Sequence, residues 1–170
     1  LAEVVGMMLD KTPANRPRDG IEAVQLLNAV LGEVQDLESL LHEALAHEPH
    51  VQWSRVGPRD VFLAETLLEN GRRQTIYIEV TAGDLAQRLV QIYSVCCASV
   101  PEFYLDALRL NSLLSHAAIA IRDVRGKEHF VVLNAYPRST VDAEELRRSI
   151  LEVAHHADAI ERQLTGGDIF

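Results

Sequence analysis

The sequence contains little cysteine: only Cys96 and Cys97 carry a thiol among its 170 residues. Neighbouring residues of a strand point to opposite faces of a sheet, so these two thiols can neither bind one metal ion together nor form an unstrained disulfide. Adjacent free thiols are typical of reduced core or half-core residues in a cytoplasmic protein. We therefore expect a cytoplasmic protein that folds without disulfides.

Long apolar runs and basic runs are also missing. No stretch approaches 18 uninterrupted apolar residues, which argues against a membrane-spanning helix in this sequence. The net charge is −9, and nucleic acids and anionic membranes bind proteins through a positive surface, so we expect neither as a partner. The 48% of apolar residues is instead typical of a globular domain with a sizeable core.

Motifs that carry chemistry are missing as well. The sequence has no glycine-rich loop that could hold a phosphate group, and no serine has a matching histidine and acid. His155 and Asp158 have the spacing of one helix face, but no third ligand is evident, so we expect them and His156 on the helix surface. We therefore expect no catalytic residue, no metal ligand and no cofactor.

The first 31 residues predict two helices separated by a rigid turn. Pro13 and Pro17 lack an amide donor and cannot continue a helix. Apolar residues then recur at helical spacing from Ile21 to Leu45. Either one long helix runs through Gly32, which costs about 1 kcal/mol relative to alanine, or Gly32 ends one helix and a second starts at Glu33.

The stretch MMLDKTPANRPRDGIEAVQLL, residues 7–27, resembles the last segment of eukaryotic-like Ser/Thr protein kinase domains. There a helix ends in Met-Leu and is followed by an acidic residue, a proline, an Arg-Pro pair and a final helix. The resemblance covers residues 1–31 and implies that Arg16, next to Pro17, forms a buried ion pair with a glutamate of the large kinase lobe. The alternative is a plain helical hairpin with a proline-stiffened turn.

The other kinase motifs are missing from this sequence. Since the chain begins at Leu1 inside a helical pattern, we expect a kinase domain to precede it in the same protein. We expect this chain itself to transfer no phosphate.

Residues 32–170 predict a second unit, in which the apolar period becomes alternating after Pro49. Residues 51–56 and 61–69 are strand-like, and Asn70-Gly71 is a strong hairpin signal. The return strand QTIYIEVTAG, residues 74–83, places Ile76, Ile78, Val80 and Ala82 on one face and Thr75, Tyr77, Glu79 and Thr81 on the other. A third strand is expected at about 88–99.

A helix is expected after this strand, with Ser99 as its N-cap and Glu102 reaching back. Its apolar stripe is Phe103, Ala107, Leu110 and Leu114. Two strands follow at residues 117–124 and 128–136, and a capping box of Asp142 and Glu145 opens the last helix. The order α-β-β-β-α-β-β-α predicts an α+β fold, with helices packed on one face of an antiparallel sheet.

Asn111 stands out because it lies among leucines in the predicted helix. A partly buried amide needs hydrogen-bond partners, so we expect its side chain to fasten the helix to the backbone of a neighbouring strand. The alternative is contact with a ligand.

The element order resembles that of the type III secretion chaperone-like superfamily, which includes Tir-chaperone and YbjN-type proteins. Three phrases carry the resemblance over residues 32–170: LDALRLNSLLSHAAIAIRD, residues 105–123, FVVLNAYPRSTVDAEELRRSILEVAHHAD, residues 130–158, and the ending AIERQLTGGDIF, residues 159–170. It implies a domain without catalytic activity that forms a homodimer and holds a peptide segment of a client protein.

Together the two resemblances predict a non-catalytic regulatory or protein-binding module at the C-terminus of a bacterial Ser/Thr protein kinase. The expected interaction face consists of Thr75, Tyr77, Glu79 and Thr81. It would pair two copies of the sheet or hold a client segment in extended form. Two alternatives are a domain that senses a small ligand or nucleotide, and a purely structural domain that pairs two kinases.

Overall fold

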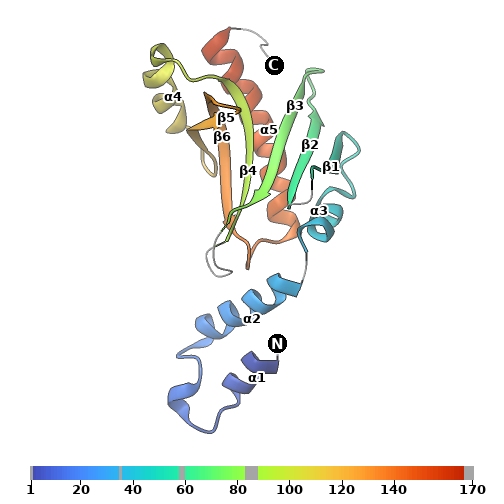
Figure 1. The fold of residues 1–170 in the computed structure, drawn as a ribbon, viewed down its shortest axis with the longest axis vertical. Coiled ribbons are helices and arrows are strands. Elements are labelled where there is room, and N and C mark those ends of the chain that lie inside the picture. Colours follow the sequence, from blue (N-terminus) through green and yellow to red (C-terminus); the bar gives the residue numbers. More distant parts are fainter. Residues whose placement is uncertain (1, 35, 58–59, 83–87, 167–170) are drawn as a thin grey trace.

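The fold was analysed in a computed structural model, which describes residues 2–34, 36–57, 60–82 and 88–166. Figure 1 shows a twisted sheet with a long helix across one face and a pair of helices extending from one end. The helices are α1 (Ala2–Met8), α2 (Gly20–Val34), α3 (Leu37–Leu45), α4 (Tyr104–Asn111) and α5 (Ala143–Thr165). Short 3-10 turns lie at Pro13–Asn15 and Pro101–Phe103.

The sheet has six antiparallel strands in the order β1-β2-β3-β4-β6-β5. The strands are β1 (Val51–Arg55), β2 (Val61–Leu67), β3 (Arg73–Val80), β4 (Leu89–Ala98), β5 (Ala118–Val124) and β6 (Lys127–Pro137). The predicted α+β class is confirmed. The count of strands before the central helix is four and not three, because β1 and β2 are separate strands that pair with each other, Val51 opposite Thr66.

The core lies between the sheet and α5. Ile76 and Ile78 of β3 are fully buried on this side, as the alternation predicts, while Thr75 and Tyr77 face the other way. The capping box expected at the start of α5 is present: the Glu145 amide donates to Asp142 at 2.8 Å. Buried α5 residues repeat at steps of three and four and cover the middle strands: Leu146, Ile150, Val153, Ala157, Ile160 and Leu164.

Both cysteines are buried in this core, which corrects the expectation that they point to opposite faces. A β-bulge between Val95 and Cys97 shifts the register of β4 against β6, so the strict alternation of the strand is interrupted there. Cys96 is fully buried and Cys97 is 2% exposed. Burial raises the pKa of the Cys96 thiol to about 12, so this thiol stays protonated and unreactive at neutral pH.

The helix boundaries near residue 35 match neither alternative drawn from the sequence. Gly32 lies inside α2, and α3 begins at Leu37 with Asp36 as its N-cap. The Asp36 carboxylate accepts the Ser39 amide and hydroxyl at 2.9 and 2.8 Å, and these bonds lower its pKa. Capping chemistry at Asp36 therefore sets where α3 begins.

Ser99 does not cap the helix that follows β4, contrary to expectation. The N-cap of the 3-10 turn is Val100, and neither that turn nor α4 has a side-chain cap.

The hairpin signal at Asn70-Gly71 is confirmed, since Gly71 has a φ of 80° and Leu67 pairs with Arg73 across the turn.

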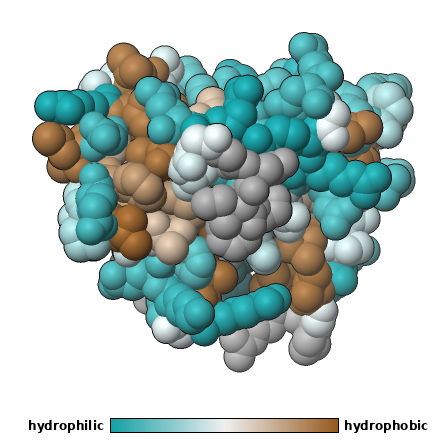
Figure 2. All heavy atoms as spheres, turned by 90° about the horizontal axis from the view of Figure 1, so that it is seen from above, coloured by the Kyte–Doolittle hydropathy of each residue, from teal (hydrophilic) through white to brown (hydrophobic). Residues whose placement is uncertain are grey.

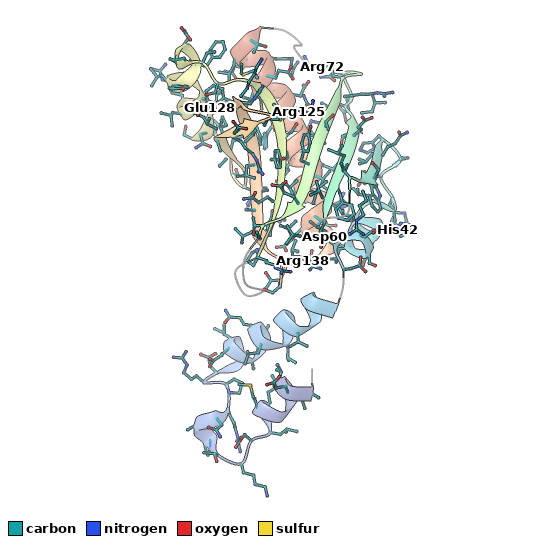
Figure 3. The ribbon with its side chains drawn as sticks, in the orientation of Figure 1. His42, Asp60, Arg72, Arg125, Glu128 and Arg138 are labelled. Carbon is teal, nitrogen blue, oxygen red and sulfur yellow. The ribbon has the colours of Figure 1, made fainter. Side chains whose placement is uncertain are left out.

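The turn between β2 and β3 is tied to α5 by charged and polar side chains in the interior. The Arg72 guanidinium lies 2.6 Å from Asp158 and 3.2 Å from Glu161, at the end of the sheet where Figure 3 labels Arg72. Glu161, fully buried, also accepts from Gln74 at 3.1 Å, and Asp158 from Asn70 at 3.0 Å. Asp158 is therefore buried and not on the helix surface as expected, while His155 is exposed.

Replacing Arg72 by alanine should lower the free energy of unfolding by about 3 kcal/mol, because two buried carboxylates would lose their central cation. Arg73→Ala is the matched control, since Arg73 is the exposed next residue, at the start of β3, and it should change the value by less than about 0.5 kcal/mol. Urea unfolding followed by circular dichroism measures both variants. Equal stabilities would show that this network does not hold the turn to α5.

Candidate protein-binding surface

The interaction face expected from the sequence lies on the side of the sheet opposite α5. Tyr77 of this face stacks on Tyr93 of β4, with ring centroids 5.0 Å apart, and the Arg122 guanidinium of β5 lies 4.0 Å from the centroid of the Tyr93 ring. Arg122 also pairs with Glu79 and donates to Gln91 at 3.2 Å. Burial and the nearby Glu79 carboxylate raise the pKa of Tyr93.

The contacts of Arg122 show that β5 bends over this face. Arg122 of β5 pairs with His129 of β6, and His129 pairs in turn with Ala98 of β4. In a flat sheet Arg122 would lie seven residues, or about 23 Å, along the strand from Gln91. A strongly coiled sheet brings them together, and the bulge in β4 favours such coiling.

The expected face is therefore only partly available to a partner. Tyr77 and Glu79 belong to the cluster around Arg122, whereas Thr75 stays exposed. Thr81 lies beyond the end of β3, where its hydroxyl accepts the Leu89 amide at 2.9 Å. β3 is paired on both sides, so an extended peptide cannot add to it as a further strand; the edge strands are β1 and β5.

A different surface exposes apolar side chains, and it is formed by α4, the turn after α4 and β5. Figure 2 looks down on this end of the molecule and shows hydrophobic side chains gathered on the left, where α4 lies in Figure 1. We call this the α4 surface. Its members, with their exposed fractions, are Tyr104 (40%), Leu105 (57%), Leu108 (69%), Leu113 (75%) and Ile121 (46%).

The α4 surface arises because α4 carries leucines on both sides. The stripe expected from the sequence faces the core: Ala107 is buried, and Phe103, Leu110 and Leu114 pack against the core cluster. Leu105 and Leu108 lie outside this stripe and point to solvent. The sequence carried this signal, since a short helix with more leucines than one stripe needs must expose some of them.

A groove of about 260 Å³ lies between α4 and β5, and Leu108 is one of its lining residues. Asn111 lies at its wall, where its side-chain oxygen accepts the Ile119 amide of β5 at 2.8 Å. This is the backbone contact that the sequence predicts for Asn111, and it fixes α4 to the edge strand. The other lining residues are Tyr104, Ala107, Ala120, Ile121 and Phe130.

The charges of α4 balance. Asp106 and Arg109 form an ion pair at 3.3 Å, and both side chains are largely exposed, at 60% and 70%. Such an exposed pair contributes little to stability. The α4 helix thus carries no net charge, in a chain whose net charge is −9.

The polar surface at the opposite end of the sheet contains paired charges. Arg55 bonds both Glu38 and Asp60, at 3.1 and 3.0 Å, and Figure 3 shows Asp60 and Arg138 near the end of the sheet that faces α2. In the described part of the chain, no three His, Cys, Asp or Glu side chains form a group that could hold a metal ion. Nor does any described helix have the length and apolar character to cross a bilayer.

Comparisons with known proteins do not assign a family. No protein-family model matches the chain, and a search of curated proteins finds no significant match.

Replacing Tyr77 by glutamate should lower the free energy of unfolding by about 1–2 kcal/mol, because the stacking on Tyr93 is lost and a carboxylate is placed near Glu79. Thr75→Gln, on the same face of β3 but exposed and opposite Glu65 of β2, adds no charge and should leave stability almost unchanged. Thermal unfolding of both variants measures the difference. If Tyr77→Glu is as stable as the original chain, the cluster around Arg122 does not stabilise this face.

Proposed function

We propose that this chain is a non-catalytic protein-binding module at the C-terminus of a bacterial Ser/Thr protein kinase, and that the α4 surface binds its protein partners. The observation that carries the binding role is the group of five large apolar side chains exposed on α4, on the turn after it and on β5. Contiguous apolar patches of this kind are typical of interaction sites in folded proteins.

The apolar area available on α4 supports a specific contact. Leu105, Leu108 and Leu113 together expose about as much surface as two whole leucine side chains, and burying one leucine contributes about 1.5–3 kcal/mol. A dissociation constant of about 1 µM requires about 8 kcal/mol in total. The leucines can therefore supply a substantial part of the binding free energy, before the costs of association are subtracted.

Two features of residues 1–31 support attachment to a kinase. The first is the resemblance of this segment to the end of kinase domains. The second is that α1 and α2, which lie away from the sheet (Figure 1), also expose large apolar side chains, as helices of a larger packed unit would: Val5, Met7, Leu9, Ile21 and Val24. Arg16 is exposed and donates to the Asp10 carbonyl at 2.6 Å. It is thus accessible to an acid of a preceding domain.

The groove argues for a protein partner over a small ligand. Its volume of about 260 Å³ is below the range of about 300–1,000 Å³ that small-molecule sites usually have. Its lining is apolar apart from Asn111 and the Tyr104 hydroxyl, and it contains no basic side chain that could bind the phosphates of a nucleotide. A groove of this kind suits an apolar side chain of another protein.

A Leu105→Asp/Leu108→Asp double variant should lose protein partners that the original chain retains, because charges would replace the apolar contact. Partners that co-purify from cells with a tagged chain can be identified and counted by mass spectrometry. The matched control is Leu67→Asp, since Leu67 is 47% exposed on β2, and it should retain the same partners. Identical partners for all three chains would contradict a binding role for the α4 surface.

For the kinase half of the proposal, the reading frame that encodes this chain should continue upstream into a complete kinase catalytic domain. Sequencing the upstream region tests this, and an unrelated domain there would overturn the attachment.

The chain by itself should show no shift in melting temperature with Mg²⁺ and ATP. A reproducible rise, which reports binding to the folded state, would favour the nucleotide-sensing alternative.

A further inference from the structure

The described part of the chain also contains a larger cavity, which lies between α3 and β1 and has a volume of about 660 Å³. This volume falls within the range of about 300–1,000 Å³ that small-molecule sites usually have. We infer that the cavity binds an organic cation, an ammonium or guanidinium group on a short carbon stem, between the ring of Trp53 and the carboxylates around it. The site is separate from the α4 surface and does not depend on the role proposed there.

Three neighbouring elements supply the side chains of this cavity. Residues four apart share one side of a helix, and alternate residues share one face of a strand, so short stretches of α3 and β1 are sufficient to line it. Figure 3 labels two of the members, His42 and Asp60, beside α3. α3 and its N-cap contribute Asp36, Glu38 and His42, β1 contributes Trp53 and Arg55, and the β1–β2 turn contributes Asp60.

Trp53 gives the cavity an aromatic wall. Its ring meets the fully buried ring of Phe62 edge to face, with centroids 6.0 Å apart. Trp53 is half-buried, so the core holds its ring while part of the side chain lines the cavity. Cations are attracted to the faces of aromatic rings, and tryptophan attracts them most strongly. A fixed indole ring therefore favours a positively charged ligand here.

The charged part of the lining is more acidic than basic. Glu38 and Asp60 share the guanidinium of Arg55, at 3.1 and 3.0 Å. The Asp36 carboxylate is a third acid, and hydrogen bonds at the start of α3 lower its pKa, so it is ionised at neutral pH. Arg138 does not line the cavity, but its cation interacts with Asp60 and Asp36. Three carboxylates against these two guanidiniums leave an excess of negative charge that a bound cation would neutralise.

These groups also exclude other classes of ligand. A nucleotide or another phosphate would be repelled by the three carboxylates. A metal ion requires several ligands that converge on one point, and within the described residues no three His, Cys, Asp or Glu side chains form such a group. An ammonium or guanidinium group instead donates hydrogen bonds to carboxylates, while its carbon stem lies against an apolar surface such as the ring of Trp53.

The fluorescence of Trp53 tests the inference directly, because Trp53 is the only tryptophan in the sequence. Cadaverine and agmatine carry ammonium or guanidinium groups at the ends of a short carbon stem. Each should change the fluorescence of the whole chain saturably, with a dissociation constant below about 1 mM. The diol with the carbon stem of cadaverine tests the need for charge, and sodium chloride at equal ionic strength tests screening. Neither should reproduce the change.

Asp36→Asn is the most informative substitution, because asparagine caps a helix as well as aspartate does. α3 should therefore still begin at Leu37, which circular dichroism checks. Combined with Asp60→Asn, it should weaken amine binding at least tenfold. The matched control is Glu65→Gln/Glu69→Gln, which removes the same formal charge from exposed positions outside the cavity and should bind amines like the original chain.

Two further ligands and variants separate the possible outcomes. Nα-acetyl-lysine amide carries the ammonium group of cadaverine beside a peptide backbone. Binding at least as tight as that of cadaverine assigns the site to a lysine of another protein, and weaker binding assigns it to a free amine. Leu105→Asp/Leu108→Asp should bind amines like the original chain, whatever it does to protein partners, because the two surfaces are separate. The inference is overturned by a fluorescence that no amine changes, by unaltered binding in Asp36→Asn/Asp60→Asn, or by an equal loss in the matched control.

Discussion

Burial of α5 against the sheet is the constraint on which the rest of this structure depends. A 23-residue helix with one continuous apolar stripe must cover the middle strands, and this decides which face of each strand becomes core. Two carboxylates of α5, those of Asp158 and Glu161, are buried as well. They lie next to Arg72 and Gln74, at the β2–β3 turn and the start of β3. The buried charges are compensated by a cation and hydrogen bonds, as burial of ions in a protein interior requires.

The face of the sheet opposite α5 is not covered by a helix in the described part of the chain. Part of this face is covered by the sheet itself, because β5 bends back and Arg122 reaches Tyr93 and Glu79, while Thr75 stays exposed. This bending also determines the position of α4, which is fastened to β5 through Asn111. The coiled sheet thus covers part of the face that the sequence predicts for interactions, and it holds α4 where its leucines are exposed.

A module of this design would suit a role in bringing protein chains together. Its acidic surface discourages non-specific association, and the apolar α4 surface offers one small, defined place for contact. A weak contact of this size responds to local concentration.

The sequence by itself determined the local features. Period-2 alternation located β3 and β4, Asn70-Gly71 the turn, and Asp142 with Glu145 the start of α5, because each of these depends on residues close together in the chain. The inner stripe of α4 and the contact of Asn111 were also predictable, since an amide among leucines requires a partner. Tertiary structure decided the rest. The register shift at Val95 placed both cysteines in the core, and the β2–β3 turn covered Asp158. The bend of β5 brought Arg122 to Glu79 and Tyr93 and so covered part of the expected interaction face. Those outcomes depend on where distant strands lie relative to one another, and sheet coiling and bulges leave no periodic pattern in the sequence.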